Sequence, residues 1–137
     1  MRGANRTAAL AALADVAAVV VFVAFGRRSH DEANSVTGIL GVAAPFLVGL
    51  VLGWALTRAA RSPLAVTTGL AVWAVTVPAG MLLRRFAWDR STAASFVIVA
   101  AIVLGALLVG WRAIANANAA RQHHPTTRHH RPTTPRG

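Results

Sequence analysis

One carboxylate lies inside an apolar stretch near the start of the chain, and its position needs a chemical reason. Between Ala8 and Gly26, Asp15 is the only ionisable residue. An acid in the middle of a membrane-spanning helix costs roughly 2.5–3.5 kcal/mol on insertion scales, so we expect Asp15 to face protein or water rather than lipid. Asp15 is therefore the candidate functional acid, and both a proton-carrying role and a buried structural role stay open.

Two residues of a later apolar stretch are the candidate partners of Asp15. The indole N–H of Trp73 needs a hydrogen-bond acceptor when it is buried, and Thr76 carries a hydroxyl that can donate. Both are expected near the depth of Asp15 in the membrane. We predict that one of them donates a hydrogen bond to the Asp15 carboxyl group.

A second polar group flanks the apolar stretches and is expected at the outer face of the membrane. Its members are Arg27, Arg28, His30, Asp31, Glu32, Arg84 and Arg85. Solvated loop ends are the simple interpretation, and an ion-pair network or a shallow anion site built on paired arginines is the alternative. The chain shows no catalytic triad, metal-ligand spacing or phosphate-binding loop, so we expect no enzyme, no cofactor and no metal site.

Four apolar runs of near-spanning length must position these residues. They cover residues 7–26, 35–56, 64–83 and 92–111. About 20 residues span a bilayer as a helix, and short connections make sequential helices antiparallel neighbours. The sequence predicts an all-α, integral membrane, four-helix up-down bundle over residues 1–115. Residues 116–137 are rich in Arg, His, Pro and Thr and are predicted to form a disordered basic tail.

Composition and charge support a membrane protein and not a nucleic-acid-binding one. The chain is 55% hydrophobic and 13% charged, has no cysteine, and has a net charge of +10. All 14 basic residues are arginines, which lie at the edges of the apolar runs and in the tail, where anionic lipids are the expected partner. The side that holds both termini has 9 arginines against 5 on the other. The positive-inside rule therefore predicts a plasma-membrane protein with both termini in the cytoplasm.

Small residues at a spacing of four form a stripe on the second apolar run. They are Gly41, Pro45, Gly49 and Gly53. Residues four apart share one helix face, and small side chains let another helix approach closely. The stripe predicts packing inside the bundle, with homodimerisation as the alternative.

Several residues recur after 57 positions, which suggests two related helical hairpins. Arg27 corresponds to Arg84 and Trp54 to Trp111, whereas the counterpart of Asp15 is Val72. Weak internal similarity of this kind is the usual trace of a parallel repeat in a membrane protein, and chance spacing is the alternative.

The chain resembles a known family over about residues 9–114. The resemblance rests on the segments GRRSHDE, PFLVGLVLGW, WAVTVPAGMLLRR and SFVIVAAIVLGALLVGWR. These look like the domain of unknown function 3054 family, small four-helix membrane proteins typical of high-GC Gram-positive bacteria. That resemblance implies the fold and no activity.

A second, looser similarity leaves two functional hypotheses. Small multidrug resistance transporters also have four helices, an acid in the first and a tryptophan in the third, although this chain has no tyrosine and carries Asp where they carry Glu. The first hypothesis is a non-enzymatic membrane scaffold or accessory subunit. The alternative is a small proton-coupled transporter that acts as a dimer, with Asp15 as the carrier acid.

Overall fold

Four long helices build the protein. The computed structural model describes residues 1–28, 35–87 and 93–122. The helices are α1 (Arg2–Arg28), α2 (Val36–Thr57), α3 (Val66–Phe86) and α4 (Ala94–Gln122), and a short 3₁₀ turn, η1 (Ala59–Arg61), lies between α2 and α3. All four helices are long and apolar enough to cross a membrane. The predicted all-α four-helix membrane bundle is therefore confirmed.

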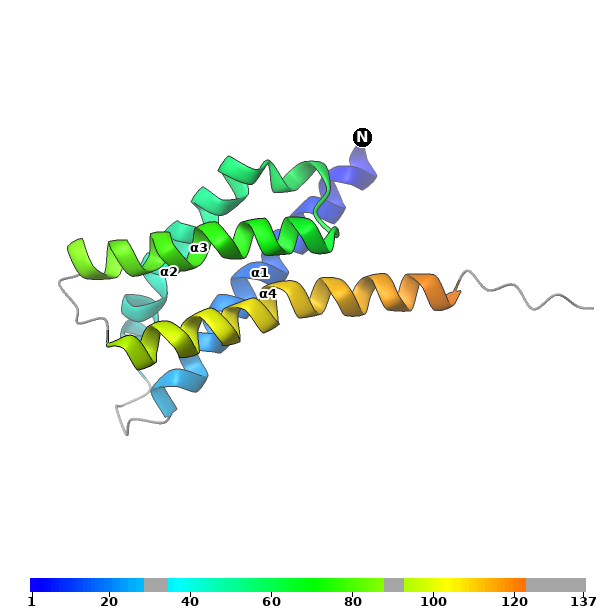
Figure 1. Cartoon of the computed structure of the whole chain (residues 1–137). Coiled ribbons are helices and arrows are strands. Elements are labelled where there is room, and N and C mark those ends of the chain that lie inside the picture. Colours follow the sequence, from blue (N-terminus) through cyan, green and yellow to red (C-terminus); the bar gives the residue numbers. More distant parts are fainter. Residues whose placement is uncertain (29–34, 88–92, 123–137) are drawn as a thin grey trace, which may run out of the picture.

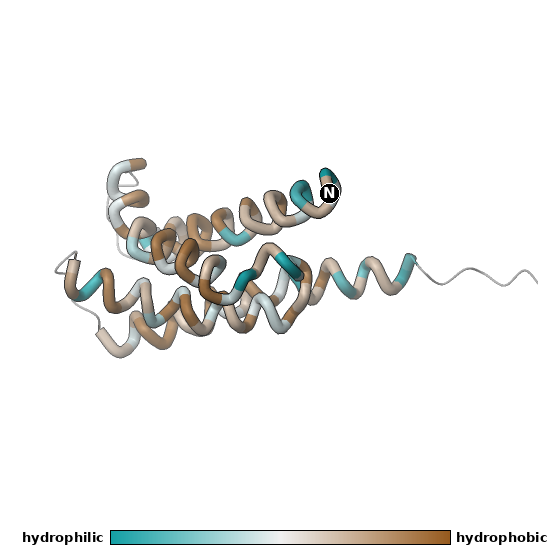
Figure 2. The backbone as a smooth tube through the Cα atoms, turned by 90° about the horizontal axis from the view of Figure 1, so that it is seen from above, coloured by the Kyte–Doolittle hydropathy of each residue, from teal (hydrophilic) through white to brown (hydrophobic). Residues whose placement is uncertain are grey.

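The helices pack as a ring in which each contacts its neighbours along the chain, and α4 closes the ring against α1. The start of α1, the α2–α3 connection and the end of α4 lie at one end of the bundle, which we call the termini end (Figure 1). The other ends of the four helices lie at the opposite end, which we call the loop end. Hydrophobic residues run along all four helices, and hydrophilic residues mark the start of α1 and the end of α4 (Figure 2).

Three of the helices bury a row of four residues spaced by four. The rows are Ala11, Asp15, Val19 and Val23 on α1, Thr68, Val72, Thr76 and Gly80 on α3, and Ala100, Leu104, Leu108 and Arg112 on α4. This spacing places side chains one above another on a helix, so each row faces the centre of the bundle. Two of the three rows contain a residue that is ionisable, and this is unusual in a bundle core.

The α2–α3 connection is shaped by defined local structure. Arg58 ends α2 in the left-handed region, with a φ of 53°, and its backbone N–H bonds back to the last turn. This is the usual way to reverse a chain after a helix. The turn η1 follows, and Ser62 then forms a side-chain hydrogen bond with Thr68 of α3 at 3.1 Å. The connection is therefore held against the helix that it enters.

The helices α1 and α4 extend beyond the predicted apolar runs, above all at the end of α4. The predicted membrane span over residues 92–111 stays a prediction, but residues 116–122, which were predicted to be disordered, are helical because α4 continues to Gln122. The segment from Ala113 to Gln122 is rich in alanine, the strongest helix former, and so extends the helix beyond the apolar run. Residues 123–137 lie outside the described residues, so the predicted disorder there stays a prediction.

Two of the stripe glycines pack inside the bundle. A Cβ on Gly49 would lie 2.8 Å from the backbone oxygen of Thr76, and one on Gly53 would lie 3.1 Å from the backbone oxygen of Val72. The glycines therefore allow α2 and α3 to approach backbone to backbone. Pro45 is buried, whereas a Cβ on Gly41 would meet nothing within 4 Å. The close contact thus covers only the half of the stripe nearer the termini end.

Candidate functional site

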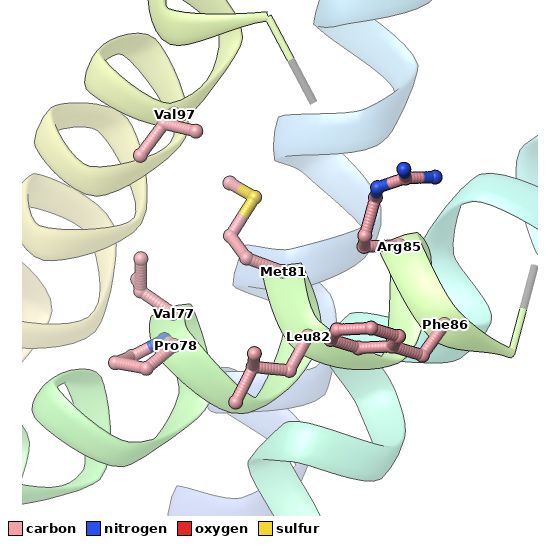
Figure 3. Close-up of a pocket in the computed structure, with 7 residues that line it drawn as sticks. All are labelled: Val77, Pro78, Met81, Leu82, Arg85, Phe86 and Val97. Carbon is pink, nitrogen blue, oxygen red and sulfur yellow. The ribbon is translucent and has the colours of Figure 1, made fainter. Parts of the chain in front are cut away.

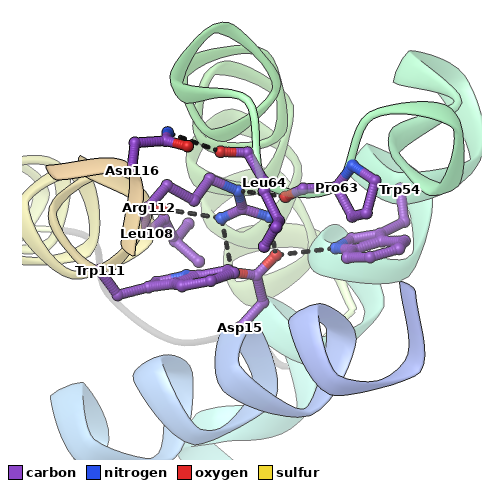
Figure 4. Close-up of polar contacts among 8 residues, drawn as sticks. All are labelled: Asp15, Trp54, Pro63, Leu64, Leu108, Trp111, Arg112 and Asn116. Carbon is purple, nitrogen blue, oxygen red and sulfur yellow. Dashed lines mark hydrogen bonds and ion pairs between the residues drawn. The ribbon is translucent and has the colours of Figure 1, made fainter. Parts of the chain in front are cut away.

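The partner of Asp15 is an arginine of the last helix. Arg112 Nη1 donates to Asp15 Oδ1 at 2.7 Å, and Arg112 Nη2 donates to Asp15 Oδ2 at 2.8 Å (Figure 4). The two side chains are 0% exposed. This is a bidentate Arg–carboxylate pair, the most directional ion pair that proteins make. It joins α1 to α4 across 97 residues of sequence.

Two indoles complete the coordination of the carboxylate. Trp111 Nε1 donates to Oδ1 and Trp54 Nε1 donates to Oδ2, each at 2.9 Å (Figure 4). The guanidinium carbon of Arg112 also lies 4.5 Å from the centroid of the Trp111 ring, within the range of a cation–π interaction. We call Asp15, Trp54, Trp111 and Arg112 the Asp15 cluster. The two tryptophans are the pair related by the shift of 57 residues, and they reach the acid from α2 and α4.

The chemistry of these contacts favours an ionised acid. Each carboxylate oxygen of Asp15 accepts one hydrogen bond from Arg112 and one from an indole. All four bonds come from N–H donors, and neither an indole N–H nor a guanidinium can accept a hydrogen bond from an O–H group. A protonated Asp15 would direct an O–H at groups that offer no lone pair. The arrangement is therefore a neutral ion pair in which charge, and not a carboxylic acid O–H, makes the contacts.

Two further N–H groups of Arg112 bind backbone carbonyls. Nε donates to the carbonyl of Pro63 at 2.8 Å, and Nη1 also donates to the carbonyl of Leu108 at 2.7 Å. One helical turn further along α4, Asn116 Nδ2 donates to the carbonyl of Leu64 at 3.0 Å. Residues 63 and 64 lie in the α2–α3 connection, so α4 holds that connection through two side chains on one face.

The third helix contributes space rather than a polar group. A Cβ on Gly69 would lie 2.9 Å from Arg112 Cδ and 3.1 Å from the backbone oxygen of Leu108. A real Cβ is almost never found as close as 2.9 Å, so a larger residue at position 69 would force the Arg112 side chain or α4 to shift. The glycine lets the Arg112 side chain pass α3 and reach Asp15. The site therefore depends on all four helices and on the α2–α3 connection.

The prediction that Trp73 or Thr76 donates to Asp15 was wrong. Trp73 Nε1 donates to the backbone carbonyl of Ala101 on α4 at 2.9 Å. Thr76 Oγ1 is buried against Gly53 and has no hydrogen-bond partner among the described residues. Depth along a helix does not fix the direction in which a side chain points. Trp73 contacts the middle of α4, whereas the partners of Asp15 lie nearer the termini end.

The predicted outer-face cluster is described only in part. Arg27 Nη1 donates to the carbonyl of Gly38 at 3.3 Å, which ties the end of α1 to the start of α2. Arg84 lies with its guanidinium carbon 4.5 Å from the centroid of the Phe96 ring, on α4. Arg85 is exposed on α3. His30, Asp31, Glu32 and the side chain of Arg28 lie outside the described residues, so the predicted ion-pair network stays a prediction.

Sequence reasoning missed Arg112 because it was counted as a topology-setting arginine at a helix end. One signal was available. Leu104, Leu108 and Arg112 are spaced by four, so the arginine continues the inward face of α4 and does not leave it. On α1, Asp15 continues an inward row in the same way. An acid and a base that each lie on a buried row of a small bundle are candidates for one another, since each is too costly to bury alone.

These features define a multi-span α-helical membrane protein in which a fully buried ion pair joins α1 to α4. Residues 12–115 match the family described as "Protein of unknown function (DUF3054)", and the chain belongs to that family. The matched region contains all four residues of the Asp15 cluster. Neither the search of curated proteins nor the search of solved structures found a match.

Proposed function

We propose that this protein is a non-enzymatic membrane scaffold or accessory subunit of the plasma membrane. The observation that supports this is the complete burial of Asp15 and Arg112, whose side chains are 0% exposed. An acid that carries protons or binds a cargo has to meet water or that cargo. Asp15 instead has each carboxylate oxygen occupied by two donors from its own chain. An acid within a membrane helix is functional by default, but a closed ion pair favours the structural role.

The orientation belongs to the same proposal. The excess of arginines at the termini end, 9 against 5, favours the cytoplasm on that side. Fusions of a topology reporter after Asn34, Arg61, Trp88 and Gly137 test this arrangement. Cytoplasmic activity is expected at Arg61 and Gly137 and external activity at the other two positions. External activity at Arg61 or Gly137 would contradict the proposed orientation.

The second candidate, a dimeric proton-coupled transporter, is favoured by the ion pair itself, because protonation of the acid would release the arginine and could open the bundle. Proton uptake by the reconstituted protein, titrated through the neutral pH range, distinguishes the two. The comparison is wild type against the double variant Asp15→Asn/Arg112→Gln, which leaves no unpaired buried charge. Identical curves are expected for a structural pair. A proton that only the wild type takes up would favour the transporter.

A further inference from the structure

An open groove lies on the surface of the bundle, away from the Asp15 cluster. It is formed mainly by α3, and α4 contributes one side chain. Its volume is about 480 Å³, and it is lined by Val77, Pro78, Met81, Leu82, Arg85, Phe86 and Val97. Figure 3 shows the Met81 side chain between α3 and Val97 of α4. This volume lies within the usual range of small-molecule pockets, about 300–1,000 Å³.

The groove changes in character along its length. Its lining is apolar except for Arg85. Val77 and Pro78 lie in the middle of α3, and Arg85 and Phe86 lie in its last turn, about 12 Å further along at 1.5 Å per residue. The apolar part therefore lies at the depth of acyl chains, and the guanidinium lies towards the headgroup level at the loop end. A ligand that fits must be apolar along most of its length and anionic at one end.

We propose that this groove binds one acyl chain of an anionic phospholipid, with the lipid phosphate at Arg85. The groove belongs to a helix long and apolar enough to span the bilayer, so lipid is the surrounding medium and reaches it without a change of structure. Leu82 and Phe86, which border it, are 58% and 80% exposed. A guanidinium has five N–H donors in a planar fork and can bind a phosphate bidentately while it makes other contacts.

Arg85, and not its neighbour, is the residue that suits the headgroup. Arg84 lies over the Phe96 ring and points towards the α3–α4 contact. Arg85 is exposed and lines the groove directly. The proposal requires only that the helices span a membrane. It holds whether the protein is a scaffold or a transporter, so the proton-uptake experiment and a lipid-binding experiment can fail independently.

Native mass spectrometry of the full-length protein tests the site. The purified protein is mixed with equal amounts of phosphatidylglycerol and phosphatidylcholine, and the lipid adducts of each class are counted. Wild type is expected to retain one phosphatidylglycerol in preference to phosphatidylcholine. Arg85→Gln is expected to lower that preference about fivefold, the change expected for one basic residue at an anionic lipid surface. Met81→Trp, which fills the groove, is expected to remove the retained lipid of either class.

Arg61→Gln is the matched control, because Arg61 is an exposed arginine at the termini end. It should leave the preference unchanged. Equal losses in Arg85→Gln and Arg61→Gln would overturn the site and leave only general attraction of anionic lipid to arginines. A groove covered by a second copy of the chain would instead appear as a dimer that Met81→Trp dissociates, and this would also overturn the proposal. Thermal unfolding of each variant establishes that the loss of lipid is not a loss of fold.

Discussion

The two halves of the bundle are held together by different chemistry. At the termini end, the Asp15 cluster joins α1, α2 and α4 by directional, charge-assisted hydrogen bonds. Towards the loop end, the rings of Phe22, Phe46 and Phe96 join the same three helices, with centroids 5.7 to 6.3 Å apart. We call these three residues the phenylalanine cluster. The phenylalanine cluster takes one side chain from each of α1, α2 and α4. The Asp15 cluster takes one from α1, one from α2 and two from α4.

The contribution of α3 is the same in both halves. A Cβ on Gly80 would lie 2.5 Å from the Phe46 ring, just as one on Gly69 would lie 2.9 Å from Arg112. Apolar burial gives little drive to helix association in lipid, so close packing and polar contacts must supply it. This bundle uses polar contacts in the Asp15 cluster and close packing in the phenylalanine cluster. Each cluster needs a glycine on α3 to make room for a large side chain from a neighbouring helix.

The largest expected difference between the halves is in the coupling free energy between side chains within each cluster. Asp15→Asn or Arg112→Gln alone should lower the free energy of unfolding by about 3–5 kcal/mol, because each leaves an unpaired group buried. The double variant should lose less than either single variant. Phe22→Leu and Phe96→Leu should show a coupling of only about 0.5–1.5 kcal/mol, as expected for an aromatic pair.

Reversible unfolding in detergent–lipid micelles measures these free energies, and the two double-mutant cycles are compared. If the losses in free energy of unfolding for Asp15→Asn and Arg112→Gln simply add in the double variant, the two residues are not coupled and the ion pair adds nothing beyond their separate contributions. The distinction between the halves would then be lost.

A smaller effect is expected at the glycines of α3. Gly69→Ala and Gly80→Ala should each lower the free energy of unfolding by about 1–3 kcal/mol, because the new methyl group displaces a packed neighbour. Gly41→Ala is the matched control, since its Cβ would meet nothing within 4 Å. That change should be neutral or should stabilise by up to about 1 kcal/mol, the helix-propensity difference between the two residues. Similar losses at all three positions would mean that α3 does not supply the space for both clusters.

The smallest expected difference is between two kinds of indole hydrogen bond. Trp54→Phe removes a donor to the Asp15 carboxylate and should cost about 1.5–3 kcal/mol, the range for bonds to charged groups. Trp73→Phe removes a donor to the neutral carbonyl of Ala101 and should cost about 0.5–1.5 kcal/mol. The chemical change is the same in the two variants, so the difference between their costs in free energy of unfolding reports whether the acceptor is charged. Equal costs would argue against an ionised Asp15 in the folded protein.

Much of the architecture could be predicted from the sequence, because membrane-spanning helices follow from local properties. The number of helices, their order and their antiparallel packing depend on the length of apolar runs and on short connections. The inward face of α3 also follows from spacing. Thr68, Val72, Thr76 and Gly80 are spaced by four, and all four are buried in the structure. The helices α1 and α4 extend beyond their apolar runs, since polar residues at the start of α1 and an alanine-rich segment at the end of α4 continue each helix.

The sequence by itself determined that Asp15 needs a partner, because an isolated acid is too costly to leave in a membrane. Only the tertiary structure decided which residue that partner is. Depth along a helix can be estimated from residue numbers, but the pairing of Asp15 with Arg112 depends on how α1 and α4 are rotated about their axes. That rotation is set by packing across the whole bundle, including the close approach that Gly69 allows. Such contacts join residues far apart in the chain, so the spacing by four can mark Asp15 and Arg112 as inward-facing but cannot show that the two side chains meet.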